Sequence, residues 1–341
     1  MCADLLVHIK DLFLNFSTFD GSTRVLNGVE LKLRAGDVLG LVGETGCGKT
    51  LTGLSIARLV PCPPGQIVAG QILFKGEDLL QKPESEMRQL RGRQITLILQ
   101  DPLSSLNPVF TIGEQMTDAI LCHETDLPSF ALSPLGGVVP SIRRRRREVA
   151  EIAVEWLDRV WIPDAASWLG AYPHELSGGM RQRVQIAMAL AGKPDLVVAD
   201  EPTTALDVST QAEILELVQR LVDDYRLSIL LISHNFSVVA KVCRQVAVMY
   251  AGNVVEWGPI SEVTADARHP YTLGLLQSIP RRGMRRGSLR GVPGSIPNLL
   301  DPPSGCRFRT RCSKVMSQCS EAFPPTVEVT PGHEVSCYLY C

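Results

Sequence analysis

The sequence lacks any apolar run long enough to cross a membrane. Its longest runs, such as SILLIS at Ser228–Ser233, are far shorter than the ~18 residues that a spanning helix needs. The opening stretch, MCADLLVHIKDLF, alternates apolar with polar positions and carries one lysine, a pattern typical of a first strand rather than of a secretion signal. We therefore expect a soluble or peripheral protein.

An excess of either charge is also missing. The 341 residues carry a net charge of −2, with 45% hydrophobic and 21% charged side chains. These values fit a globular core and give no global case for nucleic-acid binding, so we expect no nucleic acid among the partners. The sequence has no internal repeat, and its length suits one large domain with an appendage.

Strand and helix patterns alternate along most of the chain. Short β-like runs separated by turns occupy residues 1–42, and residues 66–80 are typical of a hairpin. Continuous apolar strands follow at Thr96–Gln100, Leu196–Asp200 and Ser228–Ser233. Such strands, separated by helices, predict an α/β fold with a parallel sheet covered on both faces.

A helical region is predicted from about 111 to 192. One apolar face runs along it at Val149, Ile152, Ala153, Trp156, Leu157 and Val160, the spacing of an amphipathic helix. The segment before it, Thr125–Ser141, is rich in Pro, Gly and Ser and is expected to form a loop insertion. The run Arg143–Arg147 fits a solvated helix face, with contact to anionic lipid headgroups as the alternative.

A glycine-rich segment matches the phosphate-binding pattern G-x-x-x-x-G-K-[ST] in full. It comprises Gly43, Glu44, Thr45, Gly46, Cys47, Gly48, Lys49 and Thr50, after an apolar strand at Val38–Val42 and before a helix expected at about 50–59. Backbone N–H groups of such a loop surround phosphate oxygens, and the helix N-terminus adds partial positive charge. We expect Lys49 to reach the β- and γ-phosphates and the Thr50 hydroxyl to bind Mg²⁺.

Two acids end the apolar strand at Leu196–Asp200. We expect Asp200 to hold Mg²⁺ through water and Glu201 to polarise the water that attacks the phosphate. A solvated turn would also place two acids together, but the four apolar residues before Asp200 argue against that interpretation.

The stretch LSGGMRQR, Leu176–Arg183, resembles the signature motif of ABC-transporter ATPases. The resemblance implies a P-loop NTPase with a RecA-like core, an antiparallel β subdomain and a helical signature subdomain at about 101–192, all within a nucleotide-binding domain at 1–260. It also implies further site residues: Phe16 (or nearby Phe19) against adenine, Gln100 linking Mg²⁺ to a transmembrane partner, Asp207 of Ala205–Asp207 at a dimer interface, and His234 on the γ-phosphate.

Two positions depart from common relatives, since Asn235 stands where Asp is usual and Cys47 where Ser is usual. The Cys47 thiol is expected to make ATP binding sensitive to alkylation.

The signature also fits an anion site at a helix end. Ser177 is a typical N-cap residue, and Gly178 and Gly179 leave backbone N–H groups bare at the start of a predicted helix. The resemblance implies a head-to-tail dimer in which this motif of one subunit caps the ATP that the other subunit holds. Plain helix capping is the alternative role for Ser177.

Two further stretches, Arg268–Pro280 (RHPYTLGLLQSIP) and Leu103–Pro108 (LSSLNP), resemble the ATPases of oligopeptide, dipeptide and nickel importers. The resemblance implies an ATPase that energises import, most often of peptides. It implies as partners a second ATPase subunit in a heterodimer, two transmembrane permease subunits and an extracytoplasmic binding protein. The chain would then lie peripherally on the cytoplasmic face of the inner membrane. Import of nickel or another small solute stays open, as does an ABC ATPase outside transport.

The C-terminal part, residues 261–341, is richer in Pro, Gly, Arg and Cys, and we expect it to form a small, irregular metal-binding module. It contains Cys306, Cys312, Cys319 and Cys337, and a fifth candidate at Cys341, out of ten cysteines in the chain. Four thiolates bind either Zn²⁺ or a [4Fe–4S] cluster, and the basic residues among them would neutralise either centre: Arg307, Arg309, Arg311 and Lys314. The segment Gly294–Cys337 resembles the extension of peptide-importer ATPases, which implies a structural [4Fe–4S] cluster, with Zn²⁺ or no metal as alternatives. The scattered Cys2, Cys62, Cys122 and Cys243 fit ordinary thiols.

Overall fold

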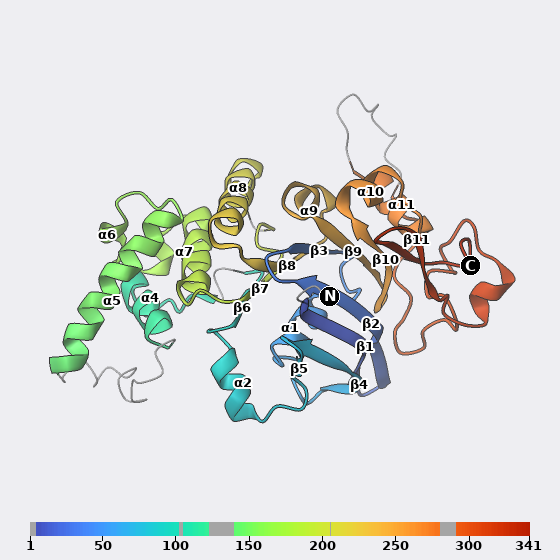
Figure 1. The fold of residues 1–341 in the computed structure, drawn as a ribbon, viewed down its shortest axis with the longest axis horizontal. Helices are drawn as coiled ribbons and strands as arrows, with labels where there is room; N and C mark the ends of the chain where they lie inside the picture. Colours follow the sequence, from blue (N-terminus) through green and yellow to red (C-terminus); the bar gives the residue numbers. More distant parts are fainter. Residues whose placement is uncertain (1–4, 102–104, 123–139, 205, 280–290) are drawn as a thin grey trace. The chain divides into compact units, whose positions relative to one another are not determined.

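The computed structural model describes residues 5–101, 105–122, 140–204, 206–279 and 291–341 (Figure 1). The chain divides into two compact units, one formed by Met1–Pro83 with Ser228–Cys341 and the other by Glu84–Leu227. Across the described ranges, no helix combines the length and the apolar character that crossing a bilayer requires.

An antiparallel sheet opens the first unit. Its strand order is β2 (Gly21–Arg34), β1 (Leu5–Thr18), β4 (Gly65–Phe74) and β5 (Glu77–Asp78). The pairing of β4 with β5 confirms the predicted hairpin. The first of the predicted short β-like runs, up to residue 18, form one long strand, β1, with a register shift after Ile9 where Asp11 takes a φ of 44°. This irregularity breaks the alternation of apolar and polar residues, so the periodicity predicts separate strands where the structure has one.

The second sheet of this unit carries the phosphate loop. β3 (Val38–Val42) pairs in parallel with β8 (Ser228–Ser233) and with β9 (Gln245–Tyr250), and every residue of β3 and β8 is buried. α9 (Phe236–Val242) packs on β3 so closely that a Cβ on Gly40 would lie 2.1 Å from Val239 Cγ1. The predicted parallel core is therefore confirmed for these strands.

The edge of this sheet departs from the parallel pattern. β10 (Asn253–Pro259) pairs antiparallel with β9, and β12 (His333–Ser336) and β11 (Thr326–Thr330) continue from it in antiparallel order. The C-terminal residues thus join the sheet that carries the phosphate loop instead of forming a wholly irregular appendage. Besides α9, the first unit contains the short helices α1 (Lys49–Ile56), α10 (Ile260–Ala265) and α11 (Pro270–Gln277).

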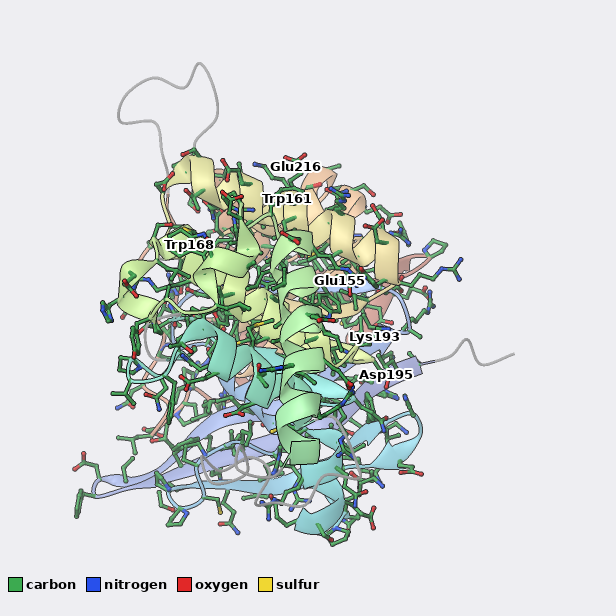
Figure 2. The ribbon with its side chains drawn as sticks, turned by 90° about the vertical axis from the view of Figure 1, so that its left-hand side faces the viewer. Glu155, Trp161, Trp168, Lys193, Asp195 and Glu216 are labelled. Atoms are coloured by element: carbon green, nitrogen blue, oxygen red, sulfur yellow. The ribbon has the colours of Figure 1, made fainter. Side chains whose placement is uncertain are left out.

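The second unit is mostly helical around one parallel strand pair. β6 (Ile95–Ile98) pairs with β7 (Leu196–Asp200). Its helices are α2 (Glu84–Leu90), α4 (Ile112–Leu121), α5 (Pro140–Arg159), α6 (Ala165–Trp168), α7 (Gly178–Ala191) and α8 (Val208–Tyr225). Figure 2 shows Trp161 and Trp168 among these helices, where the Arg183 guanidinium lies 5.5 Å from the Trp161 ring.

Helix α5 confirms the predicted apolar face. Val149, Ala153, Trp156, Leu157 and, directly after the helix, Val160 are buried, whereas Ile152 is half-buried. Most of the predicted loop insertion lies outside the described residues. Its last two residues, Pro140 and Ser141, belong to α5.

The arginine run lies within α5. Arg145 of the run pairs with Glu148 at 3.0 Å, whereas the side chains of Arg143, Arg144 and Arg146 lie outside the part of the chain that the structure describes.

Candidate nucleotide site

The phosphate loop joins the end of β3 to the start of α1, as the motif predicts. Glycine is required in this loop because a side chain would have no room and because the backbone takes a left-handed conformation. A Cβ on Gly43 would lie 2.1 Å from the Met249 carbonyl oxygen, and one on Gly48, whose φ is 107°, would lie 2.7 Å from Leu26 Cδ2. A side chain at either position would push the loop off the sheet, so the loop's shape depends on glycine there.

Lys49 is held inside the loop. Its side chain is buried, and Nζ donates hydrogen bonds to the carbonyl oxygens of Gly43 at 2.8 Å and Glu44 at 3.0 Å. Thr45, Gly46 and Thr50 are exposed along the same loop. The loop therefore presents accessible backbone and a hydroxyl at the first turn of α1, with a cation directly behind them.

Cys47 differs from the expectation of a reactive thiol. It is fully buried, and Gly252 N–H donates to its carbonyl oxygen at 2.8 Å. Burial raises the pKa of the Cys47 thiol above its ordinary value, which lowers the thiolate fraction that alkylating reagents need. Sensitivity of ATP binding to alkylation at Cys47 is therefore not supported.

His234 follows β8 directly. Because Val42 pairs with Ser233 in parallel register, Gly43 and His234 both leave the sheet at its carboxyl edge, where ligands of open α/β sheets bind. The His234 side chain is exposed. Asn235 serves as the N-cap of α9, since its side chain accepts from Ser237 N–H at 2.9 Å, so the departure from Asp keeps the capping function.

The two aromatic candidates for adenine differ in their surroundings. Phe16 lies within β1, opposite Thr23 and Gly65, and is half-buried. Phe19 lies in the turn after β1 and is fully exposed. Phe16 is therefore the more firmly positioned of the two.

Asp200 is the last residue of β7 in the second unit and Glu201 follows it, and both are buried. Glu201 adopts a φ of 46°, the left-handed region that non-glycine residues rarely occupy and that is often found at functional sites. Its Oε2 accepts hydrogen bonds from Gln100 Nε2 at 3.0 Å and from the Thr204 hydroxyl at 2.8 Å. The structure therefore brings Gln100 and Glu201 together, which no local sequence pattern predicted.

The signature motif begins α7 in the same unit. The Ser177 side chain accepts from Met180 N–H at 3.2 Å, while Ser177 and Gly178 are exposed. A Cβ on Gly179 would lie 2.6 Å from Thr210 Cγ2.

Asp207 caps α8 in this unit, accepting from Ser209 and Thr210 N–H at 3.1 and 3.0 Å. Hydrogen bonds from the Ser209 hydroxyl and from Thr210 lower the pKa of Asp207 well below its usual range. Ala205 lies outside the described residues.

The four predicted cysteine ligands gather at one place. Cys306, Cys312, Cys319 and Cys337 line a single cavity, and each is a free thiol. Burial raises the pKa of Cys306 to about 11, with a smaller contribution from the neighbouring thiols.

The expected metal-binding module is nevertheless not supported. Among the residues that the structure describes, no group of three or more His, Cys, Asp or Glu side chains is arranged to hold a metal ion. The cavity that the cysteines line holds about 10 Å³, room for no more than one water molecule.

The basic residues near these cysteines do not act as one neutralising set, contrary to expectation. Arg309 and Lys314 line the cysteine cavity. Arg307 instead donates to the carbonyl oxygens of Ala251 and Arg24. Arg311 pairs with Glu44 of the phosphate loop at 2.7 Å.

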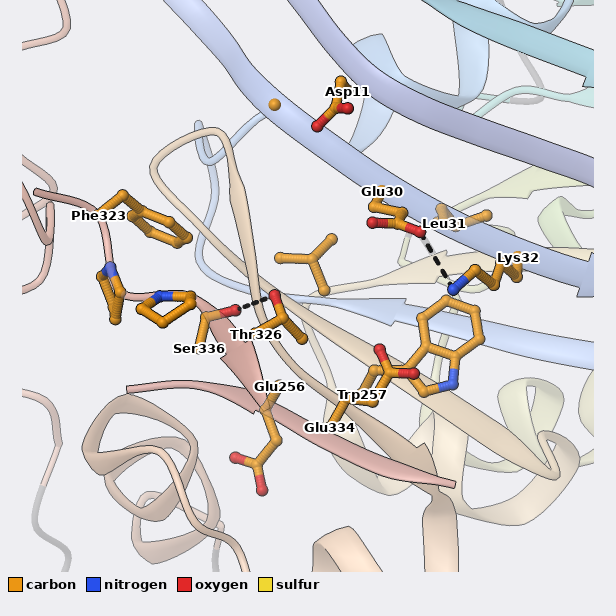
Figure 3. A pocket seen from close by; sticks show the side chains of 14 residues that line it. Asp11, Glu30, Leu31, Lys32, Glu256, Trp257, Phe323, Thr326, Glu334 and Ser336 are labelled. Atoms are coloured by element: carbon orange, nitrogen blue, oxygen red, sulfur yellow. Dashed lines mark hydrogen bonds and ion pairs between the residues drawn. The ribbon is translucent and has the colours of Figure 1, made fainter. Parts of the chain in front are cut away.

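A larger pocket in the first unit is a separate feature. It measures about 280 Å³ and is lined by Asp11, Glu30, Trp257, Phe323 and Glu334 among others (Figure 3). Figure 3 also shows the ion pair of Lys32 with Glu30 at 3.1 Å. None of the predicted site residues lines this pocket, so its size alone does not make it the nucleotide site.

The geometry described so far defines a class of protein: a P-loop nucleotide-binding fold. Solved structures agree with it. A dimeric ATP-binding cassette in a post-hydrolysis state bound to ADP and Pi aligns with a TM-score of 0.61 at 22% identity, covering 74% of this chain and 98% of that one. The CbiO1 subunit of Clostridium perfringens, part of the ABC transporter complex CbiONQ, aligns with a TM-score of 0.60 at 23% identity, covering 77% and 92%.

Sequence comparison makes the assignment specific. Residues 26–204 match the family described as ABC transporter, and residues 255–319 match the oligopeptide/dipeptide transporter C-terminal region. The chain belongs to the ABC transporter family and carries its ATPase domain. A probable peptide ABC transporter ATP-binding protein of Sinorhizobium fredii is 43% identical over 98% of this chain and 95% of its own length. The oligopeptide transport ATP-binding protein OppD of Bacillus subtilis is 43% identical over 98% and 88%, and OppD of Escherichia coli is 42% identical over 98% and 94%.

Two residues around the phosphate loop were missed by sequence reasoning. Tyr271 accepts a hydrogen bond from Glu44 N–H through its hydroxyl at 2.8 Å, and Arg311 binds the Glu44 side chain. Tyr271 lies inside the stretch that resembles importer ATPases, which was a usable signal for its importance. In the sequence, Arg311 is one of several positive charges among the cysteines, and nothing local links it to Glu44.

Proposed function

We infer that this chain is the ATP-hydrolysing subunit that energises peptide import through a membrane ABC transporter. The single observation that carries the inference is the pairing of a complete phosphate loop, Gly43–Thr50, with an oligopeptide/dipeptide transporter C-terminal region on one chain. Relatives of 42–43% identity that are named for peptide or oligopeptide transport cover 98% of this chain, which supports the same conclusion.

In this proposal the loop binds ATP and the acids complete the reaction centre. Backbone N–H groups of the loop and Lys49 hold the phosphates, and Phe16 stacks on adenine. Mg²⁺ would be held by Thr50, Gln100 and Asp200, where its charge would offset that of the phosphates. Glu201 is buried and hydrogen-bonded, so it is positioned to act as the general base toward water, and His234 would orient that water.

We propose that hydrolysis takes place between two ATPase subunits arranged head to tail. The exposed Ser177 and Gly178, with the half-buried Gly179, at the start of α7 would then cap the γ-phosphate held by the other subunit, and Asp207 would lie at the interface. The second subunit would be a different ATPase chain. Two permease subunits and an extracytoplasmic binding protein would complete the importer, with this chain on the cytoplasmic face of the inner membrane.

Uptake measurements test this function. In cells whose chromosomal copy carries Lys49→Ala, uptake of a labelled tripeptide should fall to background while uptake of a labelled free amino acid stays normal. Nickel uptake is measured in the same cells. If Lys49→Ala abolishes nickel uptake and leaves peptide uptake normal, the transporter imports nickel. Purification of the tagged chain from membranes gives an independent readout. Absence of integral membrane subunits from the purified material would contradict a transport role.

A metal–thiolate centre on the four cysteines stays a proposal. Its support is that Cys306, Cys312, Cys319 and Cys337 converge on one cavity as free thiols. The C-terminal resemblance favours a [4Fe–4S] cluster, and Zn²⁺ is the alternative, which a small cavity would accept with less rearrangement. Iron, zinc and acid-labile sulfide measured per chain after purification without oxygen separate these cases, and absence of all three would reject the centre.

A further inference from the structure

Glu44, the second residue of the phosphate loop, is held from three directions. Its side-chain oxygens accept from Arg311 Nη1 at 2.7 Å and from Nη2 at 2.9 Å. Its N–H donates to the Tyr271 hydroxyl at 2.8 Å, and its carbonyl oxygen accepts from Lys49 Nζ at 3.0 Å. Two of these three partners come from the part of the chain that follows residue 260.

Arg311 itself is firmly positioned. Its side chain is 5% exposed and that of Glu44 is 28% exposed, so the pair is largely screened from water. The guanidinium also donates to the carbonyl oxygens of Pro293 at 2.6 Å and Val292 at 3.1 Å. A bidentate pair with a fixed fork is directional as well as strong, so Arg311 sets where the Glu44 carboxylate lies.

The aromatic residues around this pair join the loop to the cysteine-containing segment. The Tyr250 ring lies 4.6 Å from that of Tyr271 and 5.0 Å from that of Phe308, and Phe308 lines the cysteine cavity. Phe308 is buried three residues before Arg311. One packed layer therefore extends from the phosphate loop to the cysteines.

The charge on Glu44 is unfavourable for a loop that binds phosphates. A carboxylate within the loop repels the several negative charges of ATP, and the repulsion is strong where water is partly excluded. The Arg311 guanidinium donates hydrogen bonds directly to the Glu44 carboxylate and so offsets its negative charge. Without Arg311 the carboxylate would lose the ion pair that offsets its charge.

We propose that Arg311 is a positioning residue of the nucleotide site, by which the C-terminal extension neutralises and orients Glu44 and so sets the affinity of the phosphate loop for ATP. The inference rests on the proposed ATP-binding function of the loop. It assigns the extension a part in nucleotide binding that does not depend on whether its cysteines hold a metal.

Calorimetric titration of the full chain with ATP and with AMP tests the proposal. Arg311→Gln should weaken ATP binding on the order of tenfold and AMP binding much less, because repulsion grows with the number of phosphates. The Glu44→Gln/Arg311→Gln double variant should recover most of the lost ATP affinity, since the uncompensated charge is gone. Arg34→Gln removes the same charge from an exposed position at the end of β2 and should leave ATP binding unchanged.

Each outcome decides the proposal. ATP affinity of Arg311→Gln equal to that of the unmodified chain overturns it, and so does a double variant as weak as Arg311→Gln. Should Arg311→Gln fail to fold, Arg311→Lys carries the test, because it keeps the charge while losing the two-point contact and should bind ATP with intermediate affinity. An unmodified chain that binds no ATP would instead reject the nucleotide site itself.

Discussion

The side-chain amide of Gln100 donates a hydrogen bond to the Glu201 carboxylate over 3.0 Å, and the Thr204 hydroxyl donates to the same oxygen over 2.8 Å. Two donors on one oxygen fix the carboxylate at the end of β7. A carboxylate held in this way is positioned to act on a water molecule from a fixed direction.

Glu201→Gln should therefore keep ATP binding and lose hydrolysis. The amide has nearly the shape of the acid but no longer accepts a proton, so we expect kcat to fall by roughly 10²–10⁴-fold with the Kd for ATP unchanged or lower. Phosphate release by the assembled transporter and retention of labelled ATP measure the two effects. Hydrolysis near the normal rate would show that Glu201 is not the base.

The two loop glycines Gly43 and Gly46 should respond differently to alanine. Gly43→Ala places a Cβ 2.1 Å from the Met249 carbonyl oxygen, whereas a Cβ on Gly46, at a φ of 85°, meets no atom within 4 Å. Gly46→Ala should cost only the strain of a left-handed residue, about 1–2 kcal/mol of unfolding free energy. Gly43→Ala should cost clearly more, because backbone must move.

Thermal unfolding of both variants and of the unmodified chain measures this difference. Equal melting temperatures for Gly43→Ala and Gly46→Ala would mean that the loop does not pack tightly against Met249 of β9.

Thiol labelling should spare Cys47. Cys47 and Cys243 are buried, while Cys62 and Cys341 are exposed, and burial raises the pKa of the Cys47 thiol. A raised pKa means less thiolate at any pH below it, so labelling of the buried Cys47 should be slow at neutral pH, and labelling of the exposed Cys62 should be faster. Mass spectrometry after timed exposure to N-ethylmaleimide at several pH values reads each site. Rapid labelling of Cys47 at neutral pH, in chain that remains folded, would contradict the buried position.

A buried acid joins β10 to the C-terminal strand. Glu256 accepts from His333 Nε2 at 2.8 Å and from the N–H groups of Arg268 at 2.7 Å and His269 at 3.0 Å, and its side chain is 0% exposed. Glu256→Ala leaves three donors without their acceptor, so it should lower the free energy of unfolding by about 3–5 kcal/mol.

Denaturant unfolding of the full chain tests this, with Glu334→Ala as the matched control, because Glu334 lies next to His333 on β12 and is partly exposed. A loss of stability no larger than that of the control would mean that the carboxylate of Glu256 is not the anchor of this edge.

Local features were predictable from the sequence, and contacts between distant residues were not. The phosphate loop, the acid-ended strand β7 and the apolar face of α5 each lie within one contiguous segment, where spacing and residue type carry the signal. The bond between Arg311 and Glu44 joins residues 267 positions apart, and that between Gln100 and Glu201 joins residues 101 apart. No periodicity connects such pairs, so only the fold reveals them.

The C-terminal segment contains both a feature that the sequence predicts and contacts that it does not. Their clustering on one cavity follows from the resemblance of the C-terminal segment, and the structure brings all four together. What each nearby arginine does could not be inferred from charge alone, because Arg307 and Arg311 turn toward the residues around the phosphate loop while Arg309 stays beside the thiols.

The pairing of β12 with β10 has a consequence for synthesis. β10 ends at Pro259 and its neighbour begins only at His333, so a growing chain has already made the phosphate loop and the signature helix long before this edge of the sheet is closed. Until then the β10 edge is open to other strands, and Glu256 lacks its imidazole partner. A chain interrupted before His333 would thus contain every predicted catalytic residue and still expose an unfinished sheet, which marks such fragments for aggregation or removal.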